Sequence, residues 1–450
     1  MRYLPHTEEE IQEMLEVVGK ESLDDLFSSV PAECRYQGDI PIPAALTEWQ
    51  LKDHFAALMS KNRVNQEHKV LIGAGSYDHY VPEILPSLMS RSEFLTAYTP
   101  YQPEVAQGTL QGIFEYQTLT ARLLGTDAVN ASMYDGASAL AESALMSFRI
   151  ARKKKTVALS AAIHPHYREV VATYLQATDF TIIELPVDAE GRTDLSSLAG
   201  IEGLASVAIQ SPNFFGVVED LQGCGEKIHD VDALFISCFS EALAYGLLKS
   251  PGECGADIIC GEGQSFGLGR SYGGPGVGMM GCRDKLVRNM PGRIVGQTLD
   301  TKGKRGFVLT LATREQHIRR EKATSNICSN QGICAMTAGM YMATLGGTGI
   351  RQLARLNYDK AAYLRSELIK LGAKPLFDAP VFNEFALRFP FDFERVREAL
   401  KEESVVAGLS LEAYYPDLQG AYLFCATETL KKEDIDRIVS SIKKHALQEV

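Results

Sequence analysis

Short apolar strands alternate with amphipathic helical stretches between Gly108 and Cys282, and this alternation restricts the fold more than any other feature of the chain. A helical stretch from Thr109 to Leu124 precedes the strand AVNASM, and the strands TVALS, TIIELP, SVAIQ, ALFIS and ADIIC follow it. Alternation at this spacing favours right-handed βαβ crossovers. The sequence therefore predicts an α/β fold with a mostly parallel sheet, whose ligands bind beyond the carboxyl ends of the strands.

The turn after the strand AVNASM is a candidate anion site. It reads Tyr134-Asp135-Gly136-Ala137-Ser138 and opens a helix. Such a turn brings free backbone N–H groups to the positive end of a helix dipole, where a phosphate binds well. Its candidate residues are Asp135, Gly136 and Ser138. Many α/β turns of this kind bind nothing, so the pattern supports a plain turn as well.

Two further loops at the same expected edge carry polar side chains. His164, before Pro165, could stack on a ring or serve as an acid or base, but histidine before proline is also a common turn residue. Asn213 follows Pro212, where it suits a turn and could equally contact a ligand. Both interpretations stay open for each residue.

The stretch from Gly255 to Cys282 reads GADIICGEGQSFGLGRSYGGPGVGMMGC. A strand enters a polar turn, and a glycine-rich passage then leads into a second apolar strand. In pyridoxal-phosphate enzymes built on the large doubly wound fold, this architecture carries the lysine that holds the cofactor as a Schiff base. Here no lysine lies between Lys249 and Lys285, and Gln264 stands at the expected position. Because an amide nitrogen is not a nucleophile, the chain cannot tether the cofactor there.

Composition excludes several classes of partner. A net charge of −12 disfavours nucleic acid and anionic membranes, and the one basic run, from Arg152 to Lys155, fits the end of a helix better than a binding patch. Nine cysteines without CxxC pairs or zinc-type spacing indicate a reducing compartment and no metal site. Since we find neither a signal peptide nor an apolar run of about 20 residues, we expect a cytoplasmic protein.

The order of elements predicts three parts. The N-terminal part contains two helices, the first capped at Thr7 and the second running from Thr47 to Ser60. We expect the following division: a helical arm over residues 1–70, a large α/β domain over 71–330, and two connecting helices (331–345 and 350–371) with a small α+β domain over 331–450.

Two segments stand out by composition. Residues 73–104 are dense in Tyr, Pro and Gly, and their tyrosines need packing or hydrogen-bond partners, which indicates a segment that forms a site or an interface. A plain structural crossover is the alternative.

Residues 313–323 bring several Arg, His and Lys side chains close together, as in sites that bind carboxylate or phosphate. A solvated charged face gives the same pattern.

Six segments together resemble subunit 1 (alpha) of the glycine decarboxylase P-protein, from the glycine cleavage system. They are GAGSYDHYVP, RSEFLTAYTPYQPEVAQGTLQ, ASMYDGAS, QSPNFFGVVED, GADIICGEGQSFG and REQHIRREKATSNICSNQ. The resemblance spans nearly the whole chain. It implies fold type I of the pyridoxal-phosphate enzymes and a two-subunit enzyme, glycine dehydrogenase (aminomethyl-transferring). That enzyme decarboxylates glycine and passes the aminomethyl group to the lipoyl arm of the H-protein.

The resemblance also implies a division of roles between subunits. Subunit 2 (beta) supplies the lysine and holds pyridoxal phosphate in an alpha2beta2 heterotetramer, and no cofactor is bound covalently to this chain. Glu241 lies where relatives suggest an Asp beside the pyridine nitrogen, so we expect no complete cofactor site here. The residues expected near a shared site are Tyr98, Tyr101, Gln102, His317 and Arg319. A degenerate cofactor pocket would contain Asp135, Gly136, Ser138, His164, Asn213, Glu241 and Gln264.

An alternative of another class stays open. The chain could be a pure scaffold or regulatory pseudoenzyme subunit that binds the partner and the H-protein but lines no active site. Polar contacts from Tyr98 to Gln102 into the partner's pocket would favour the enzyme subunit, whereas apolar packing there would favour the scaffold. An autonomous aminotransferase or decarboxylase is contradicted by the missing lysine.

Overall fold

The computed structural model describes residues 5–36, 38–62, 68–327 and 329–447. The chain forms two compact units, Met1–Arg63 and Val64–Val450. The first unit contains α1 (Glu8–Val17) and α2 (Glu48–Met59). At the start of α1 the side chains of Thr7 and Glu10 accept hydrogen bonds from each other's backbone N–H groups, as a capping box requires. Both helices that the sequence predicts in this part are confirmed.

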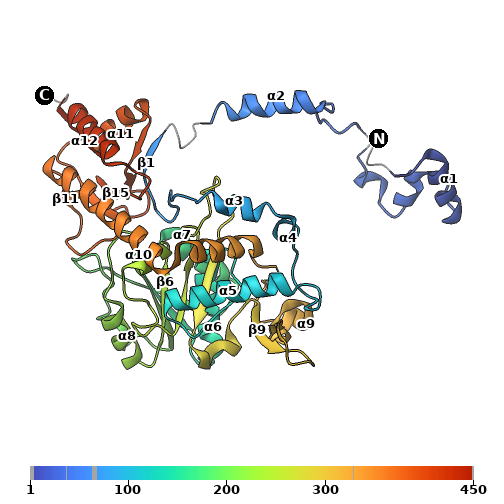
Figure 1. The fold of residues 1–450 in the computed structure, drawn as a ribbon, viewed down its shortest axis with the longest axis horizontal. Helices are drawn as coiled ribbons and strands as arrows, with labels where there is room; N and C mark the ends of the chain where they lie inside the picture. Colours follow the sequence, from blue (N-terminus) through green and yellow to red (C-terminus); the bar gives the residue numbers. More distant parts are fainter. Residues whose placement is uncertain (1–4, 37, 63–67, 328, 448–450) are drawn as a thin grey trace. The chain divides into compact units, whose positions relative to one another are not determined.

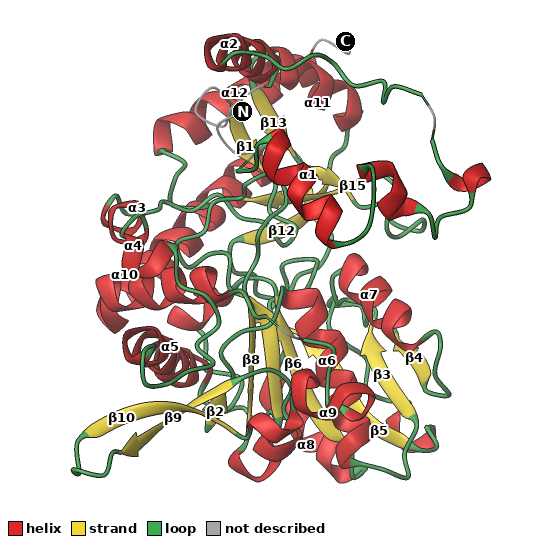
Figure 2. Cartoon of the chain, turned by 90° about the vertical axis from the view of Figure 1, so that its right-hand side faces the viewer, coloured by secondary structure: helices red, strands yellow, loops and turns green. Residues whose placement is uncertain are grey.

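A seven-stranded sheet forms the centre of the second unit, in the order β2-β8-β7-β6-β5-β3-β4 (Figure 2). All neighbours from β7 to β4 are parallel, and β8 is antiparallel to both β7 and β2. The expected mostly parallel sheet is therefore confirmed. The strands are β2 (Ala128–Val129), β3 (Thr156–Ser160), β4 (Thr181–Leu185), β5 (Leu204–Gln210), β6 (Leu234–Phe239), β7 (Ile258–Glu262) and β8 (Gly278–Cys282).

Helices cover both faces of this sheet, because its strands are apolar on both sides. Along β3, Val157 and Leu159 pack into one core with α6 and α7, whereas Ala158 packs into a second core with α5, α8 and α10. Four of the helices that cover the sheet are α5 (Gln107–Leu124), α6 (Gly136–Ile150), α7 (Pro165–Leu175) and α8 (Leu221–Asp230), as Figure 1 shows. Two short helices, α3 (Ile84–Met89) and α4 (Ser92–Leu95), precede them.

An antiparallel hairpin of β9 (Ile294–Leu299) and β10 (Arg305–Thr310) was not expected from the sequence. The hairpin packs against α5, where Val295 and Phe307 join Leu110 and Ile113 in a small core. The short helix α9 (Gln316–Arg319) follows it. Ile294 is also buried, but the other residues of the two strands are partly buried or exposed, and their sequence carries little apolar alternation.

The long helix α10 (Gly332–Lys370) leads to a smaller four-stranded antiparallel sheet. Gly346 inside α10 has φ +61° and ψ 176°, so the element consists of two helices, as the sequence predicts. The domain limits at residues 70 and 330 stay a prediction. The remaining α-helices and strands of the described residues are β1 (Lys69–Leu71), β11 (Lys374–Pro375), β12 (Glu384–Arg388), α11 (Phe393–Glu402), β13 (Val405–Ala407), β14 (Leu409–Ser410), β15 (Ala421–Cys425) and α12 (Lys432–Ala446).

Candidate functional site

Gln264 lies in the turn that follows β7, and its side chain is only 6% exposed. The amide oxygen accepts a hydrogen bond from the Tyr77 N–H at 2.9 Å, and the amide nitrogen donates to the Tyr77 carbonyl at 3.1 Å. The same nitrogen donates to the Leu268 carbonyl at 2.6 Å. Every polar atom of this side chain is therefore engaged with backbone, and the residue joins the turn to a segment far away in the sequence.

Glu262, at the end of β7, directs its carboxylate to the first turn of α6. The Gly136 N–H donates to Oε2 at 2.9 Å, and the Gln264 and Val277 N–H groups donate to Oε1 at 3.0 and 2.8 Å. Burial raises the pKa of Glu262 although these three donors oppose the shift. A Cβ at position 136 would lie 2.8 Å from the Glu262 nitrogen, so glycine is needed for this close approach. The Glu262 carboxylate thus accepts the hydrogen bond of the Gly136 N–H, which the sequence analysis expected to bind an anionic ligand.

Asp135 and Ser138 complete the start of α6. The Asp135 carboxylate accepts from the Ser138 N–H at 2.7 Å, and the Ser138 hydroxyl accepts from the Asp135 N–H at 3.1 Å. This reciprocal pair is a capping box, and it engages a second N–H of the predicted anion site. Whether the turn also contacts a ligand in the complex stays a prediction.

Glu241 is held by a buried histidine that the sequence analysis did not single out. His79 Nε2 lies 2.9 Å from the Glu241 carboxylate, and His79 Nδ1 lies 2.8 Å from that of Glu428. Asn383 also donates to Glu241, at 3.1 Å. Although burial disfavours a charged ring, the two carboxylates outweigh it and raise the pKa of His79 to about 10. The Glu241 carboxylate therefore has a buried cationic partner within the chain, which it shares with Glu428.

Tyr77 connects Gln264 to Ser240 and Glu384. Its ring is buried, and its hydroxyl donates to Glu384 at 2.7 Å and lies 3.1 Å from the Ser240 hydroxyl. Burial raises the pKa of Glu384 to about 7, against hydrogen bonds from the Ala74 N–H and Tyr77. The segment before α3 thus covers the carboxyl edge of the sheet, and its Tyr77 and His79 side chains bond to residues that follow β6 and to residues of the smaller sheet region.

These contacts do not fit pyridoxal phosphate. The amide at position 264 offers no amine and is bound to backbone, the Glu241 carboxylate is paired with His79, and the first N–H of α6 donates to Glu262. A phosphate at the α6 start would meet an internal carboxylate, and like charges repel at this distance. The residues present therefore do not form a binding site for this cofactor.

His164 caps the start of α7. Its Nδ1 accepts from the His166 N–H at 3.2 Å, which leaves Nε2 to donate to the Ala74 carbonyl at 2.9 Å. The ring packs against Tyr167 and Phe214. Burial lowers the pKa of His164 to about 4, so the ring is neutral at neutral pH. These contacts are those of a helix-capping residue, and a role towards a ligand stays a prediction.

Asn213 forms a closed set of turn hydrogen bonds. Its amide oxygen accepts from the Phe215 and Val217 N–H groups, and its amide nitrogen donates to the Gly191 carbonyl and to Glu219. All four partners are in the chain itself. The geometry fits the turn interpretation of this residue, and no polar atom of its side chain faces open space.

The second group of candidates lies at the surface, where Arg293 joins two segments that the sequence analysis treated separately. Its guanidinium donates to the Thr99 hydroxyl at 3.3 Å and to the Tyr101 hydroxyl at 3.0 Å. Its Nε donates to the Glu315 carboxylate at 3.2 Å. Residues 95–102, called here the aromatic segment, are thereby connected to the residue that precedes α9. The sequence analysis did not single out Arg293, because one arginine after Pro291-Gly292 carries no pattern of its own.

The remaining surface candidates differ in how firmly they are held. Tyr98 is 75% exposed and Tyr101 43% exposed, and Gln102 is also exposed. Arg319 is exposed and donates to the nearby Thr313 carbonyl at 3.2 Å. The backbone of His317 belongs to α9, but its side chain lies outside the described part of the structure.

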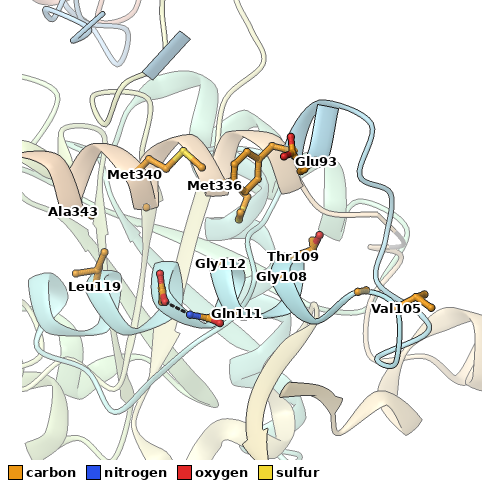
Figure 3. A pocket seen from close by; sticks show the side chains of 14 residues that line it. Glu93, Val105, Gly108, Thr109, Gln111, Gly112, Leu119, Met336, Met340 and Ala343 are labelled. Carbon is orange, nitrogen blue, oxygen red and sulfur yellow. Dashed lines mark hydrogen bonds between the residues drawn. The ribbon is translucent and has the colours of Figure 1, made fainter. Parts of the chain in front are cut away.

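An apolar trough runs between α5 and α10, as Figure 3 shows. Met336 and Met340 on α10 and Leu119 on α5 line a cavity of about 540 Å³. Adjoining cavities of about 270 and 470 Å³ are lined by the aromatic segment and share Thr109 with the first. This trough and the exposed tyrosines form one continuous surface.

Two kinds of site receive no support from the structure. Among the described residues, no group of three or more His, Cys, Asp and Glu side chains could hold a metal ion. No helix in the described ranges is long and apolar enough to span a membrane.

Comparisons with known proteins match the chain over nearly its whole length. The family model described as Glycine cleavage system P-protein matches residues 1–442. The probable glycine dehydrogenase (decarboxylating) subunit 1 of Desulforamulus reducens is 47% identical over 448 residues, 98% of this chain and 99% of the relative. The protein of the same description from Geobacillus kaustophilus is 46% identical over 443 residues, 98% of each chain. A crystal structure of glycine decarboxylase (P-protein) in inhibitor-bound form has a TM-score of 0.90 at 43% identity, covering 99% of this chain and 100% of that one.

Proposed function

Because the chain belongs to the glycine cleavage system P-protein family, we propose that it is the subunit of glycine dehydrogenase (decarboxylating) that tethers no cofactor. In this proposal a second P-protein subunit (beta) holds pyridoxal phosphate on its own lysine. The two subunits together decarboxylate glycine and transfer the aminomethyl group to the lipoyl group of the H-protein. The assembly is an alpha2beta2 heterotetramer in the cytoplasm.

One observation carries the proposal: the place where a cofactor lysine would stand is closed by internal hydrogen bonds. Gln264 is bonded to the backbone of Tyr77, and Glu262 is bonded to the first N–H of α6. A chain that cannot hold the cofactor can still serve the reaction if it completes a site on another chain. The fold is thus retained for assembly rather than for its own chemistry.

The surface around the aromatic segment supports this role. Tyr98, Tyr101 and Gln102 are exposed, and they present hydroxyl and amide groups beside the buried cation of Arg293. Hydroxyl and amide donors suit the carboxylate of glycine or the phosphate of a cofactor on the partner. The apolar trough next to them supplies the kind of surface that a subunit interface buries. In the proposal this chain contributes polar side chains to the partner's site and excludes water around it.

A scaffold without active-site residues is the second candidate. It is favoured by the apolar side chains that line the cavity beside Tyr98, among them Phe94, Ile113 and Met336. In that case the exposed tyrosines would pack against apolar groups of the partner, and their hydroxyls would be dispensable. The two candidates therefore differ in what removal of a single hydroxyl does to the rate.

The experiment is exchange of labelled bicarbonate into the carboxyl group of glycine. The purified chain is assayed alone, with the partner subunit, and with the partner subunit plus pyridoxal phosphate and lipoylated H-protein. We expect exchange only in mixtures that contain both subunits. Full exchange by the partner subunit without this chain would overturn the proposal, and exchange by this chain alone would overturn the interpretation of Gln264.

A hydroxyl deletion then separates the enzyme subunit from the scaffold. We expect Tyr98→Phe to lower the exchange rate about 10-fold or more, as loss of a positioned hydroxyl does in other enzymes. Tyr358→Phe on α10 is the matched control and should have the activity of the unmodified chain. An unchanged rate for Tyr98→Phe, Tyr101→Phe and their double variant would favour the scaffold.

A further inference from the structure

Arg293 is a buried cation directly before β9, and each of its three guanidinium nitrogens donates to a side chain of another segment. Its side chain is 3% exposed, and it contacts Thr99, Tyr101 and Glu315 through three different nitrogens. The guanidinium carbon also lies 5.1 Å from the centroid of the Tyr101 ring. A planar guanidinium can hold three partners at once because its five N–H donors have fixed directions.

The backbone around Arg293 is itself firmly held. Its carbonyl accepts from the Ala131 N–H at 2.7 Å, beside the central sheet. Arg314 donates to the Gly292 carbonyl at 3.1 Å. Gly292 has φ +75°, and a Cβ there would lie 2.9 Å from the Asn130 side chain. The backbone that carries the guanidinium is therefore held beside the central sheet by contacts within this chain.

The energetics argue that this ion pair is not retained for stability alone. Burying Arg293 and Glu315 removes two charges from water, and a buried pair often contributes no more stability than apolar side chains of the same volume. What an apolar replacement could not do is orient a hydroxyl. The Tyr101 hydroxyl accepts from the guanidinium at 3.0 Å, which fixes the hydroxyl while the ring stays half exposed.

We propose that Arg293 is a positioning residue for the glycine decarboxylase reaction. It holds the hydroxyls of Tyr101 and Thr99 in the aromatic segment in the orientation that meets the partner's reacting groups. Arg293 touches no reacting atom and acts through Tyr101. The inference rests on the proposed function, because Arg293 can position Tyr101 for the reaction only if the aromatic segment completes the partner's site.

The test is a double-mutant cycle in the reconstituted complex of both subunits with pyridoxal phosphate and lipoylated H-protein. Arg293→Lys, Tyr101→Phe and the double variant are compared for kcat and KM of glycine–bicarbonate exchange. We expect each single variant to lower kcat about 10-fold and the double variant to be no slower than the slower single one, because coupled residues are not additive. For Arg293→Lys the affinity between subunits should stay within about threefold of the unmodified complex, since the substituted side chain is buried.

Arg293→Lys keeps the charge beside Glu315 but loses the planar fork, which makes it the informative substitution. A lysine variant with full kcat would overturn the proposal, because charge alone would then suffice. Independent effects that multiply in the double variant would overturn it as well. Arg283→Lys is the matched control; this arginine donates to the Gly255 and Ala256 carbonyls, and its substitution should leave kcat unchanged.

Folding is followed separately by thermal melting of the isolated chain. If Arg293→Lys does not fold, the variant Arg293→Gln with Glu315→Gln replaces it, because the buried charge is then removed in both partners. Failure of the proposed function has a different signature from failure of this inference. The first is full exchange by the partner subunit alone, and the second is an active two-subunit complex that does not respond to Arg293→Lys.

Discussion

The side-chain amide of Gln264 pairs with both backbone groups of Tyr77, accepting from its N–H at 2.9 Å and donating to its carbonyl at 3.1 Å. Two residues on neighbouring antiparallel strands exchange the same pair of hydrogen bonds through their backbones. Here a side-chain amide takes the place of one backbone. It joins the turn after β7 to the segment that covers the carboxyl edge of the sheet. An amide satisfies both partners, whereas the ammonium group of a lysine has no acceptor for the N–H.

Restoring the missing lysine should therefore not restore cofactor binding. We expect Gln264→Lys to leave the Tyr77 N–H unsatisfied and to bury an amine, which should lower the free energy of unfolding by about 3 kcal/mol. After incubation with pyridoxal phosphate and dialysis, the variant should show no imine absorbance band. Urea unfolding and absorbance spectra provide the measurements, with exposed Gln176→Lys as control. A stable band would contradict our account of the closed site.

Replacing the carboxylate at the α6 start should destabilise the chain. In Glu262→Gln one of the two oxygens becomes an NH₂ group that faces a backbone N–H, either that of Gly136 or those of Gln264 and Val277. We expect a loss of about 2 kcal/mol in the free energy of unfolding, because a buried donor loses its acceptor. Glu253→Gln at the surface is the control. A variant as stable as the unmodified chain would show that these hydrogen bonds contribute nothing net.

The buried His79 predicts a pH dependence of stability. The folded-state pKa of His79 is raised to about 10 from an ordinary value of 6.5. A raised pKa contributes stability that is present in full below pH 6.5 and lost as the pH rises towards 10. The free energy of unfolding, measured by urea titration across this range, should therefore fall more steeply for the unmodified chain than for His79→Asn.

His79→Asn should also cost about 3–5 kcal/mol at neutral pH, since it leaves the Glu241 and Glu428 carboxylates without their buried cation. His54→Asn, in the exposed helix α2, should change neither the stability nor its pH dependence. Equal slopes for the unmodified chain and His79→Asn would mean that the ring is not charged in the folded state.

Two adjacent glycines in α10 should respond in opposite directions. Gly346 has φ +61° and ψ 176°, and a Cβ there would meet no other atom, so an added side chain would be opposed by the backbone conformation alone. We expect Gly346→Ala to cost about 1–3 kcal/mol of unfolding free energy. Gly347→Ala, also in open space but helical, should gain about 0.5–1 kcal/mol. Thermal unfolding of both variants measures the two changes. Equal effects of Gly346→Ala and Gly347→Ala would show that the backbone conformation at Gly346 does not require glycine.

Much of the fold could be predicted because local patterns carry it. The strands TVALS and ALFIS are apolar on both faces, and the helix from Thr109 to Leu124 has helical periodicity, so the βαβ order follows from the sequence. The sequence analysis did not predict the hairpin of β9 and β10, because most residues of the two strands are partly buried or exposed and leave little apolar alternation. The pairing of β1 with β13 joins residues more than 300 positions apart through two three-residue strands, which leave no periodic signal.

The sequence by itself determined that this chain carries an α/β fold and lacks the amine for a Schiff base at Gln264, because periodicity and functional groups are properties of individual residues. The tertiary structure alone decided that Glu262 accepts from the first N–H of α6, that His79 pairs with Glu241, and that Arg293 contacts both Tyr101 and Glu315. Each of these contacts joins residues 22 to 192 positions apart, where only the packing of the sheet and its loops determines which side chains meet.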